Sequence, residues 1–141
     1  MAITLETQIA IAAPVEEVWA ALTKPELVKQ YFFGTDLVTN WQVGSPIFFR
    51  GEWDGTKYED KGTVLLYDPL NSLRYSYLSS WSNLADEPGN YANITYALHE
   101  EGGVTVLTVT QDKIEDEEKR AHSEQNWQMV FDGMKKMLEK G

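Results

Sequence analysis

The feature that most restricts the fold is the last part of the chain, residues 115–140, which contains no proline and carries apolar residues at helical spacing. This pattern predicts a helix with one buried face. A helix of about 25 residues spans about 37 Å, which is enough to cross a whole small sheet. The apolar stripe consists of Trp127, Val130, Phe131, Met134, Met137 and Leu138.

Strand patterns fill most of the chain before this helix. Apolar and polar residues alternate in segments bounded by Gly, Pro, Asn and Asp, which is typical of strands with one buried face. Two short helices are predicted after the first strand, at 14–23 and 26–31, and Asp54-Gly55 predicts a hairpin. The predicted strands are 4–12, 36–41, 45–53, 57–67, 72–79, 91–99 and 104–111.

Strands that follow one another in sequence imply an antiparallel sheet with its helices on one face, which is an α+β fold. We expect residues 1–141 to form a single domain, because compact domains usually contain about 100–200 residues. Gly62 lies inside a predicted strand and indicates a bulge or bend there.

Charge and composition exclude several classes of function. The net charge of −10 opposes binding to nucleic-acid phosphates and to anionic membranes. The chain has no cysteine, which excludes disulfides, thiolate metal sites and thiol nucleophiles. No apolar run approaches the ~18 residues of a membrane span, and the first residues lack a signal-peptide pattern. We therefore expect a cytoplasmic protein with no nucleic-acid or membrane partner.

The carboxylates at 112–118 do not have the spacing of a calcium-binding loop, so no metal site is predicted. Phosphate-binding glycine loops and a nucleophile elbow are also missing, so we expect no cofactor. Charged residues on adjacent predicted strands can pair across the sheet, and one that points inward would be a polar anchor requiring a partner. These residues are Arg50, Glu52, Glu59, Asp60 and Arg74.

Several segments resemble a known family. The segment Ile-Ala-Ile-Ala-Ala-Pro-Val-Glu-Glu-Val-Trp at 9–19 is similar to the opening of START-like (SRPBCC) helix-grip domains. Residues 30–34, 51–55, 58–62 and 122–127 resemble bacterial homologues of the activator of heat-shock protein 90 ATPase. The resemblance implies a curved antiparallel sheet of about six to seven strands wrapped around the C-terminal helix, with a cavity between them.

Helix-grip domains host lipid carriers, polyketide cyclases and co-chaperones, so the fold leaves the function open. Our leading hypothesis is binding of a small apolar molecule, aromatic or lipid-like, in the implied cavity. The chain contains five Trp, seven Tyr and five Phe, and such residues fill a core or line a pocket. The predicted ligand-binding residues are Phe32, Phe33, Phe48, Trp53, Tyr75, Tyr77, Trp81, Tyr96, Trp127, Phe131 and Met134.

Two other functions fit the sequence. One is an enzyme of the polyketide cyclase or dehydratase type, with His122 or a cavity tyrosine or glutamate in acid–base catalysis. His122 lies one turn before the apolar stripe, with Gln125 and Asn126 on the same helix face. The alternative to a catalytic role is a structural one, in which His122 makes a hydrogen bond between the helix and a loop. The other function is a stress-related protein that binds a chaperone.

Overall fold

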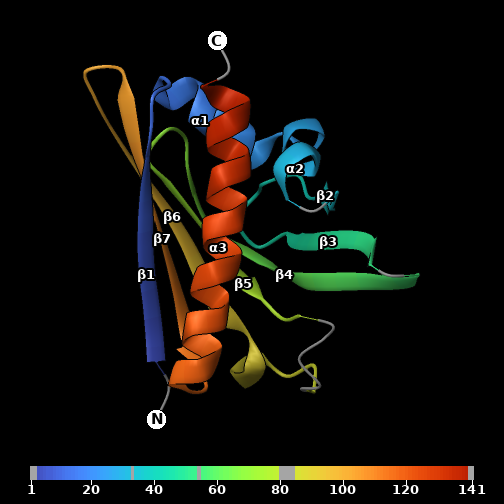
Figure 1. Cartoon of the computed structure of the whole chain (residues 1–141). Coiled ribbons are helices and arrows are strands. Elements are labelled where there is room, and N and C mark those ends of the chain that lie inside the picture. Colours follow the sequence, from blue (N-terminus) through green and yellow to red (C-terminus); the bar gives the residue numbers. More distant parts are fainter. Residues whose placement is uncertain (1–2, 33, 54, 80–84, 140–141) are drawn as a thin grey trace.

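Seven antiparallel strands form one sheet, and one long helix lies across its inner face in the computed structural model (Figure 1). The structure describes residues 3–32, 34–53, 55–79 and 85–139. Along the sheet the strands follow the order β1-β7-β6-β5-β4-β3-β2. The elements are β1 (Ile3–Ile11), α1 (Val15–Thr23), α2 (Pro25–Tyr31), β2 (Asp36–Val38), β3 (Pro46–Trp53), β4 (Thr56–Asp68), β5 (Ser72–Tyr77), a 3-10 turn (Pro88–Asn90), β6 (Ala92–Glu101), β7 (Val104–Ile114) and α3 (Glu117–Leu138).

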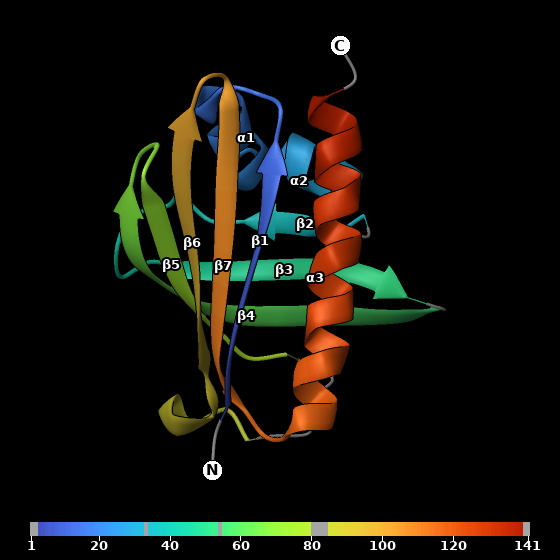
Figure 2. The same ribbon diagram turned by 60° about the vertical axis from the view of Figure 1, so that its left-hand side comes forward.

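The predicted α+β architecture, a curved antiparallel sheet around a C-terminal helix, is confirmed. Curvature is plain when two views are compared: β1 and β7 run alongside α3, whereas β3 and β4 run crosswise beneath it (Figure 2). The hairpin predicted at 54–55 joins β3 to β4, where Trp53 pairs with Thr56 and Gly55 has a φ of 78°. A positive φ is what a tight hairpin turn requires of its glycine.

The second strand is shorter than predicted, because β2 ends at Val38 and not at Trp41. The Thr39 hydroxyl accepts a hydrogen bond from the Trp41 amide, and the Asn40 side chain accepts one from the Gln42 amide. Such local bonds turn the backbone out of the strand. Trp41 itself has a φ of 61°, which no strand residue adopts.

The crosswise part of the sheet depends on β4, which changes partner along its length. β4 pairs with β3 up to Thr63 and with β5 from Val64 onward, with an irregularity between Val64 and Leu66. Gly62 lies at this change of partner. A Cβ there would lie 1.6 Å from the carbonyl oxygen of Ser76. The predicted irregularity is therefore present, although the bulge itself lies after Gly62.

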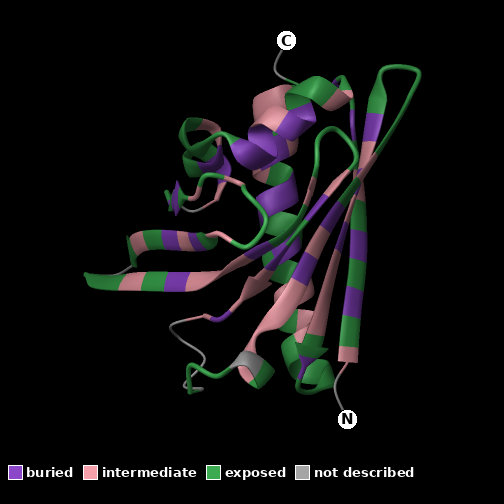
Figure 3. Ribbon diagram, turned by 180° about the vertical axis from the view of Figure 1, so that it is seen from behind, coloured by how far each residue is buried: buried purple, intermediate pink, exposed green. Residues whose placement is uncertain are grey.

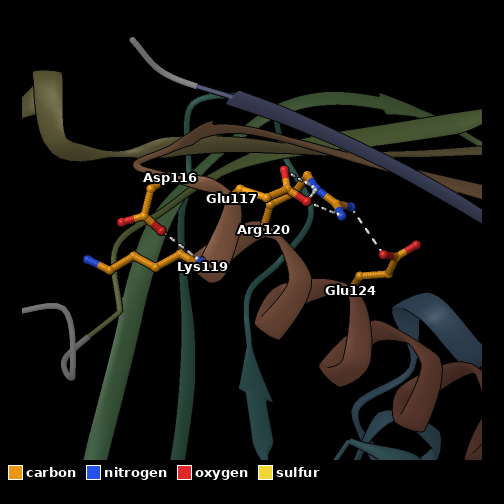
Figure 4. A network of polar contacts seen from close by, with 5 residues as sticks. All are labelled: Asp116, Glu117, Lys119, Arg120 and Glu124. Carbon is orange, nitrogen blue, oxygen red and sulfur yellow. Dashed lines mark hydrogen bonds and ion pairs between the residues drawn. The ribbon is translucent and has the colours of Figure 1, made fainter.

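Helix α3 begins at Glu117, where the Asp116 carboxylate accepts a hydrogen bond from the Lys119 amide at 2.9 Å (Figure 4). An aspartate in this position satisfies one of the free amides of the first turn. Arg120 bridges the carboxylates of Glu117 and Glu124 on the next turn (Figure 4). These side chains hold the start of the helix, so the buried stripe farther along is presented in one orientation.

The stripe on α3 packs against the inner face of the sheet, and buried residues alternate with exposed ones along β1 (Figure 3). Polar bonds fix the helix over the first strand: Gln128 donates to the Thr7 hydroxyl and Lys135 donates to the Ala10 carbonyl. Trp127, Val130, Phe131 and Met134 are buried in the core. Within the described ranges, no helix has the length and apolar character to cross a membrane.

Candidate ligand-binding site

Aromatic side chains from five elements meet between α3 and the sheet. Their ring centroids lie 5.3 to 6.4 Å from those of their neighbours, and most pairs are tilted or edge-to-face, which is the favourable arrangement. We call this group the aromatic cluster. It consists of Tyr31, Phe32, Phe49, Tyr75, Tyr77, Tyr96, Trp127 and Phe131.

Strand alternation and helix periodicity bring these rings together. Tyr75 and Tyr77 are two residues apart on β5, so both face inward. Trp127 and Phe131 are one turn apart on α3, and the Trp127 indole N–H donates to the Gln111 side chain of β7 at 3.0 Å. Phe32 follows the last turn of α2 and contacts Phe49 and Trp127, so it joins the helical pair to both the sheet and α3.

The tyrosine hydroxyls of the cluster have defined hydrogen-bond partners. The hydroxyls of Tyr75 and Tyr96 lie 3.0 Å apart, and the Tyr31 hydroxyl donates to the Ala21 carbonyl at 2.6 Å. Burial raises the pKa of Tyr96 to about 12 and also raises the pKa of Tyr75 and Tyr31 well above the ordinary value. These hydroxyls therefore stay protonated at neutral pH, where each can donate a hydrogen bond and the Tyr75–Tyr96 pair also contains an acceptor.

Asp60 fulfils the condition set for an inward polar anchor. It pairs with Phe49 across β3 and β4, and its side chain faces the same interior as the cluster, with the residue 7% exposed. The Tyr77 hydroxyl donates to an Asp60 carboxylate oxygen at 2.6 Å. Burial raises the pKa of Tyr77 well above its usual range, and the nearby Asp60 charge raises it further. Among the described residues, Asp60 is the only buried acidic or basic side chain.

The free space inside the cluster is small, about 10 Å³. This is close to the least volume that holds a single water molecule. The cavity that the resemblance implied is therefore filled by aromatic side chains in this conformation, and a larger guest requires at least one ring to move. The space is lined by Leu22, Val28, Tyr31, Phe32, Leu37, Trp41, Phe49, Tyr75 and Tyr96.

Most of the predicted ligand-binding residues that are described lie together. Met134 is buried in the core beside them, 1% exposed. Phe33, Trp81 and the side chain of Trp53 fall outside the described part of the chain. The predicted residues in the aromatic cluster are Phe32, Tyr75, Tyr77, Tyr96, Trp127 and Phe131.

Phe48 is the described exception. It lies on the outer face of β3, where the Arg50 guanidinium carbon is 4.7 Å from its ring centre, so it is not part of the cluster. The residue that takes its place is Phe49, which the ligand-site prediction omitted. The alternation of β3 already contained the signal, because Ile47 and Phe49 form its buried face.

His122 lies on the surface of α3, and Gln125 and Asn126 beside it are exposed as well. The imidazole is therefore in water and not within the aromatic cluster. No group of three His, Cys, Asp or Glu side chains in the described ranges is arranged to hold a metal ion.

Comparisons with known proteins identify a matching family and several similar structures. Residues 12–139 match the family model described as activator of Hsp90 ATPase homolog 1-like protein. A solution structure from Cytophaga hutchinsonii is 40% identical, with a TM-score of 0.85, and the match covers 98% of this chain and 94% of that one. No curated protein sequence matches significantly.

Two more distant structures share the fold. The Aha1 dimer from Colwellia psychrerythraea is 18% identical with a TM-score of 0.76, over 97% of this chain and 96% of that one. CalU16 from Micromonospora echinospora is 22% identical with a TM-score of 0.74, over 94% of this chain and 74% of that one.

Proposed function

The chain belongs to the activator of Hsp90 ATPase homolog 1-like family, and we propose that it binds a small planar apolar molecule within its aromatic cluster. The observation that carries the proposal is the continuous contact of rings from α2, β3, β5, β6 and α3, in which the rings from α2, β3, β5 and β6 line the interior space. Aromatic walls with a few oriented polar groups are the usual lining of a small-molecule site. A planar guest would make the same edge and stacking contacts with these rings that they make with one another.

The hydroxyl groups support a binding role over a purely structural one. A core that only had to be filled would be served by phenylalanine, which brings no polar atom into the interior. The paired hydroxyls of Tyr75 and Tyr96 instead place donors and acceptors at the centre of the cluster. A guest with a hydroxyl or carbonyl group can exchange bonds with this pair, which gives the site orientation as well as affinity.

Phe32 is the ring best placed to admit a guest. It is partly exposed, and it follows the end of α2 with φ −108° and ψ 56°, outside the helical region. Its ring lies 6.2 Å from that of Phe49 and 6.3 Å from that of Trp127. An outward rotation of this side chain would join the interior space to solvent without breaking any strand pairing.

The proposal is tested by NMR titration with naphthylmethanol, a neutral planar probe. We expect shift changes of the Trp127 indole N–H, which reports through its bond to Gln111, and of the backbone amides of Tyr75 and Tyr96. The outer-face residue Phe48 serves as the internal reference and should not respond. Shift changes confined to surface residues, or none up to the solubility limit of the probe, would reject the proposal.

Phe32→Ala is expected to increase the affinity for naphthylmethanol by about tenfold, because an apolar cavity left by a deleted side chain accepts apolar guests. The same change should lower the free energy of unfolding by about 1–3 kcal/mol, less than for a fully buried phenylalanine. Fluorescence titration and urea denaturation measure the two effects.

Phe48→Ala is the matched control for Phe32→Ala, since it removes the same side chain from a partly buried position on the opposite face of the sheet. It should leave the affinity for naphthylmethanol unchanged. Equal affinities of the wild type and the Phe32 variant would show that this ring does not cover the site.

The other two functions predicted from the sequence stay predictions. A chaperone-binding, stress-related role is suggested by the family description, and capture of the intact protein by purified chaperone tests it. A cyclase-like reaction would need a base, and the buried tyrosines are protonated donors. Turnover of a polyketone substrate that is lost in the Tyr96→Phe variant would establish such an activity.

A further inference from the structure

The interior space of the aromatic cluster has few polar atoms on its walls. The described residues that line it include no charged side chain, and four of them bring a side-chain polar atom: Tyr31, Trp41, Tyr75 and Tyr96. These atoms are hydroxyl oxygens and an indole nitrogen, and each carries one hydrogen. The bonds that these hydrogens already make determine what kind of ligand atom the space can receive.

Two of the four hydrogens are bonded to backbone carbonyls. The Trp41 indole N–H donates to the Thr23 carbonyl at 2.9 Å, and the Tyr31 hydroxyl donates to the Ala21 carbonyl at 2.6 Å. Ala21 lies four residues before Pro25, which has no N–H, so the hydroxyl supplies the bond that a helical amide would otherwise make. Neither hydrogen can bond a ligand without leaving a backbone carbonyl unpaired.

The other two hydrogens belong to the hydroxyls of Tyr75 and Tyr96, which lie 3.0 Å apart. The bond between them uses one hydrogen, whichever tyrosine is the donor, so the pair has one hydrogen left over. Within the described part of the chain, neither hydroxyl has a second hydrogen-bond partner. Tyr75 is 2% exposed and Tyr96 is 6% exposed, and burial raises the pKa of both hydroxyls. The leftover hydrogen is therefore buried and stays in place at neutral pH.

A buried donor needs an acceptor, because an unmade hydrogen bond in the interior is destabilising. The free space that the pair lines is about 10 Å³, close to the least volume that holds one water molecule, which means one oxygen atom. Phenylalanine at both positions would fill the core without leaving a donor there. The leftover hydrogen and the small space together form a subsite for a single acceptor oxygen.

We propose that the ligand is a neutral planar molecule with one acceptor oxygen, such as a ketone or an ester, which accepts the leftover hydrogen of the Tyr75–Tyr96 pair. This inference rests on the proposed function and specifies its ligand class. The oxygen occupies the small interior space, and the rings of the ligand pack against the aromatic cluster. A protonated amine or a carboxylate is disfavoured, because one neutral donor cannot replace the hydration of a charge.

The first test compares acetylnaphthalene with isopropenylnaphthalene, which has the same shape but carries a methylene carbon in place of the carbonyl oxygen. NMR titration of the intact protein gives each affinity, which is divided by the probe's partition coefficient from water into hexane. On this scale we expect the ketone to exceed the alkene by at least about tenfold. Equal values would overturn the inference and leave the proposed function intact, whereas failure of both probes and of naphthylmethanol to bind would reject both.

Charged probes with the same ring system test the second part of the inference. Naphthoic acid and naphthylmethylamine are ionised at neutral pH, and each should bind at least about tenfold more weakly than acetylnaphthalene. An ionised probe that binds as tightly as the ketone, with shift changes at Tyr75 and Tyr96, would contradict a neutral ligand.

The double variant Tyr75→Phe/Tyr96→Phe is expected to abolish the preference for the ketone over the alkene. Removing both partners of a buried bond keeps the rings and leaves neither hydroxyl unpaired, so this variant should fold. Tyr67→Phe/Tyr91→Phe is the matched control, because it removes two hydroxyls from residues that do not line the space. The control should keep the full preference. A preference that survives in the Tyr75/Tyr96 variant would overturn the inference.

The infrared carbonyl band of bound acetylnaphthalene gives a readout that depends neither on affinity nor on a variant folding. In the wild-type protein we expect this band at a lower wavenumber than in hexane, because a hydrogen bond to the oxygen weakens the carbonyl bond. A bound ketone whose band stays at the hexane position would show that its oxygen accepts no hydrogen bond, and would overturn the inference.

Discussion

Gly62→Ala is expected to lower the free energy of unfolding by more than about 4 kcal/mol, which is exceptional for one methyl group. The added Cβ would lie 1.6 Å from the carbonyl oxygen of Ser76 and 2.5 Å from its carbonyl carbon. Both are backbone atoms, so no side-chain rotation can relieve the clash. The strands must separate where β4 changes partner, and the bond from the Thr63 amide to the Ser76 hydroxyl would be lost as well.

Urea denaturation followed by tryptophan fluorescence measures this loss. A domain of ordinary stability, about 5–15 kcal/mol, would be left marginal or unfolded at room temperature. Gly89→Ala is the matched control, because a Cβ there has no atom within 4 Å and the residue does not require a positive φ. It should stay within about 0.5 kcal/mol of the wild type. Equal denaturation midpoints for the two variants would refute the close approach at Gly62.

The sequence predicted the architecture well because the architecture depends on local periodicity. Alternation on β5 and helical spacing on α3 are read over a few residues, and each determines which face is buried. The end of β2 was harder to predict, because it depends on two side-chain hydrogen bonds. The Thr39 and Asn40 side chains each accept a bond from the backbone amide two residues later. These local bonds and strand pairing are close in energy, so the residue types alone do not predict where the strand ends.

The site was predicted only in part, because its chemistry depends on contacts between distant strands. The bond between Tyr75 and Tyr96 follows from the pairing of β5 with β6, which sequence spacing does not reveal. The burial of Asp60 also depends on distant parts of the chain. Glu59 and Asp60 are adjacent acidic residues on β4, and their sequence does not show that Asp60 alone is buried. The implied cavity came from family resemblance, and the small interior volume depends on how the rings of this particular chain pack.

Phe131→Ala is expected to lower the free energy of unfolding by about 3–5 kcal/mol, the usual cost of deleting a buried aromatic side chain. Phe131 is 0% exposed on α3, and its ring lies 6.2 Å from that of Trp127 at the back of the cluster. Neighbouring strands and the helix are held by polar bonds, such as that between Gln128 and Thr7, so they cannot collapse fully into the space. The measurement is urea denaturation, as for Gly62→Ala.

Met129→Ala on the same helix is the control for Phe131→Ala, since Met129 is 53% exposed. This change should lower the free energy of unfolding by less than about 0.5 kcal/mol. Naphthylmethanol should restore part of the stability lost in the Phe131 variant, because a guest that binds only the folded state stabilises it by mass action. The same probe should have no such effect on Met129→Ala beyond that on the wild type. A Phe131 variant that is destabilised but not rescued would mean that the aromatic cluster is a core and not a binding site.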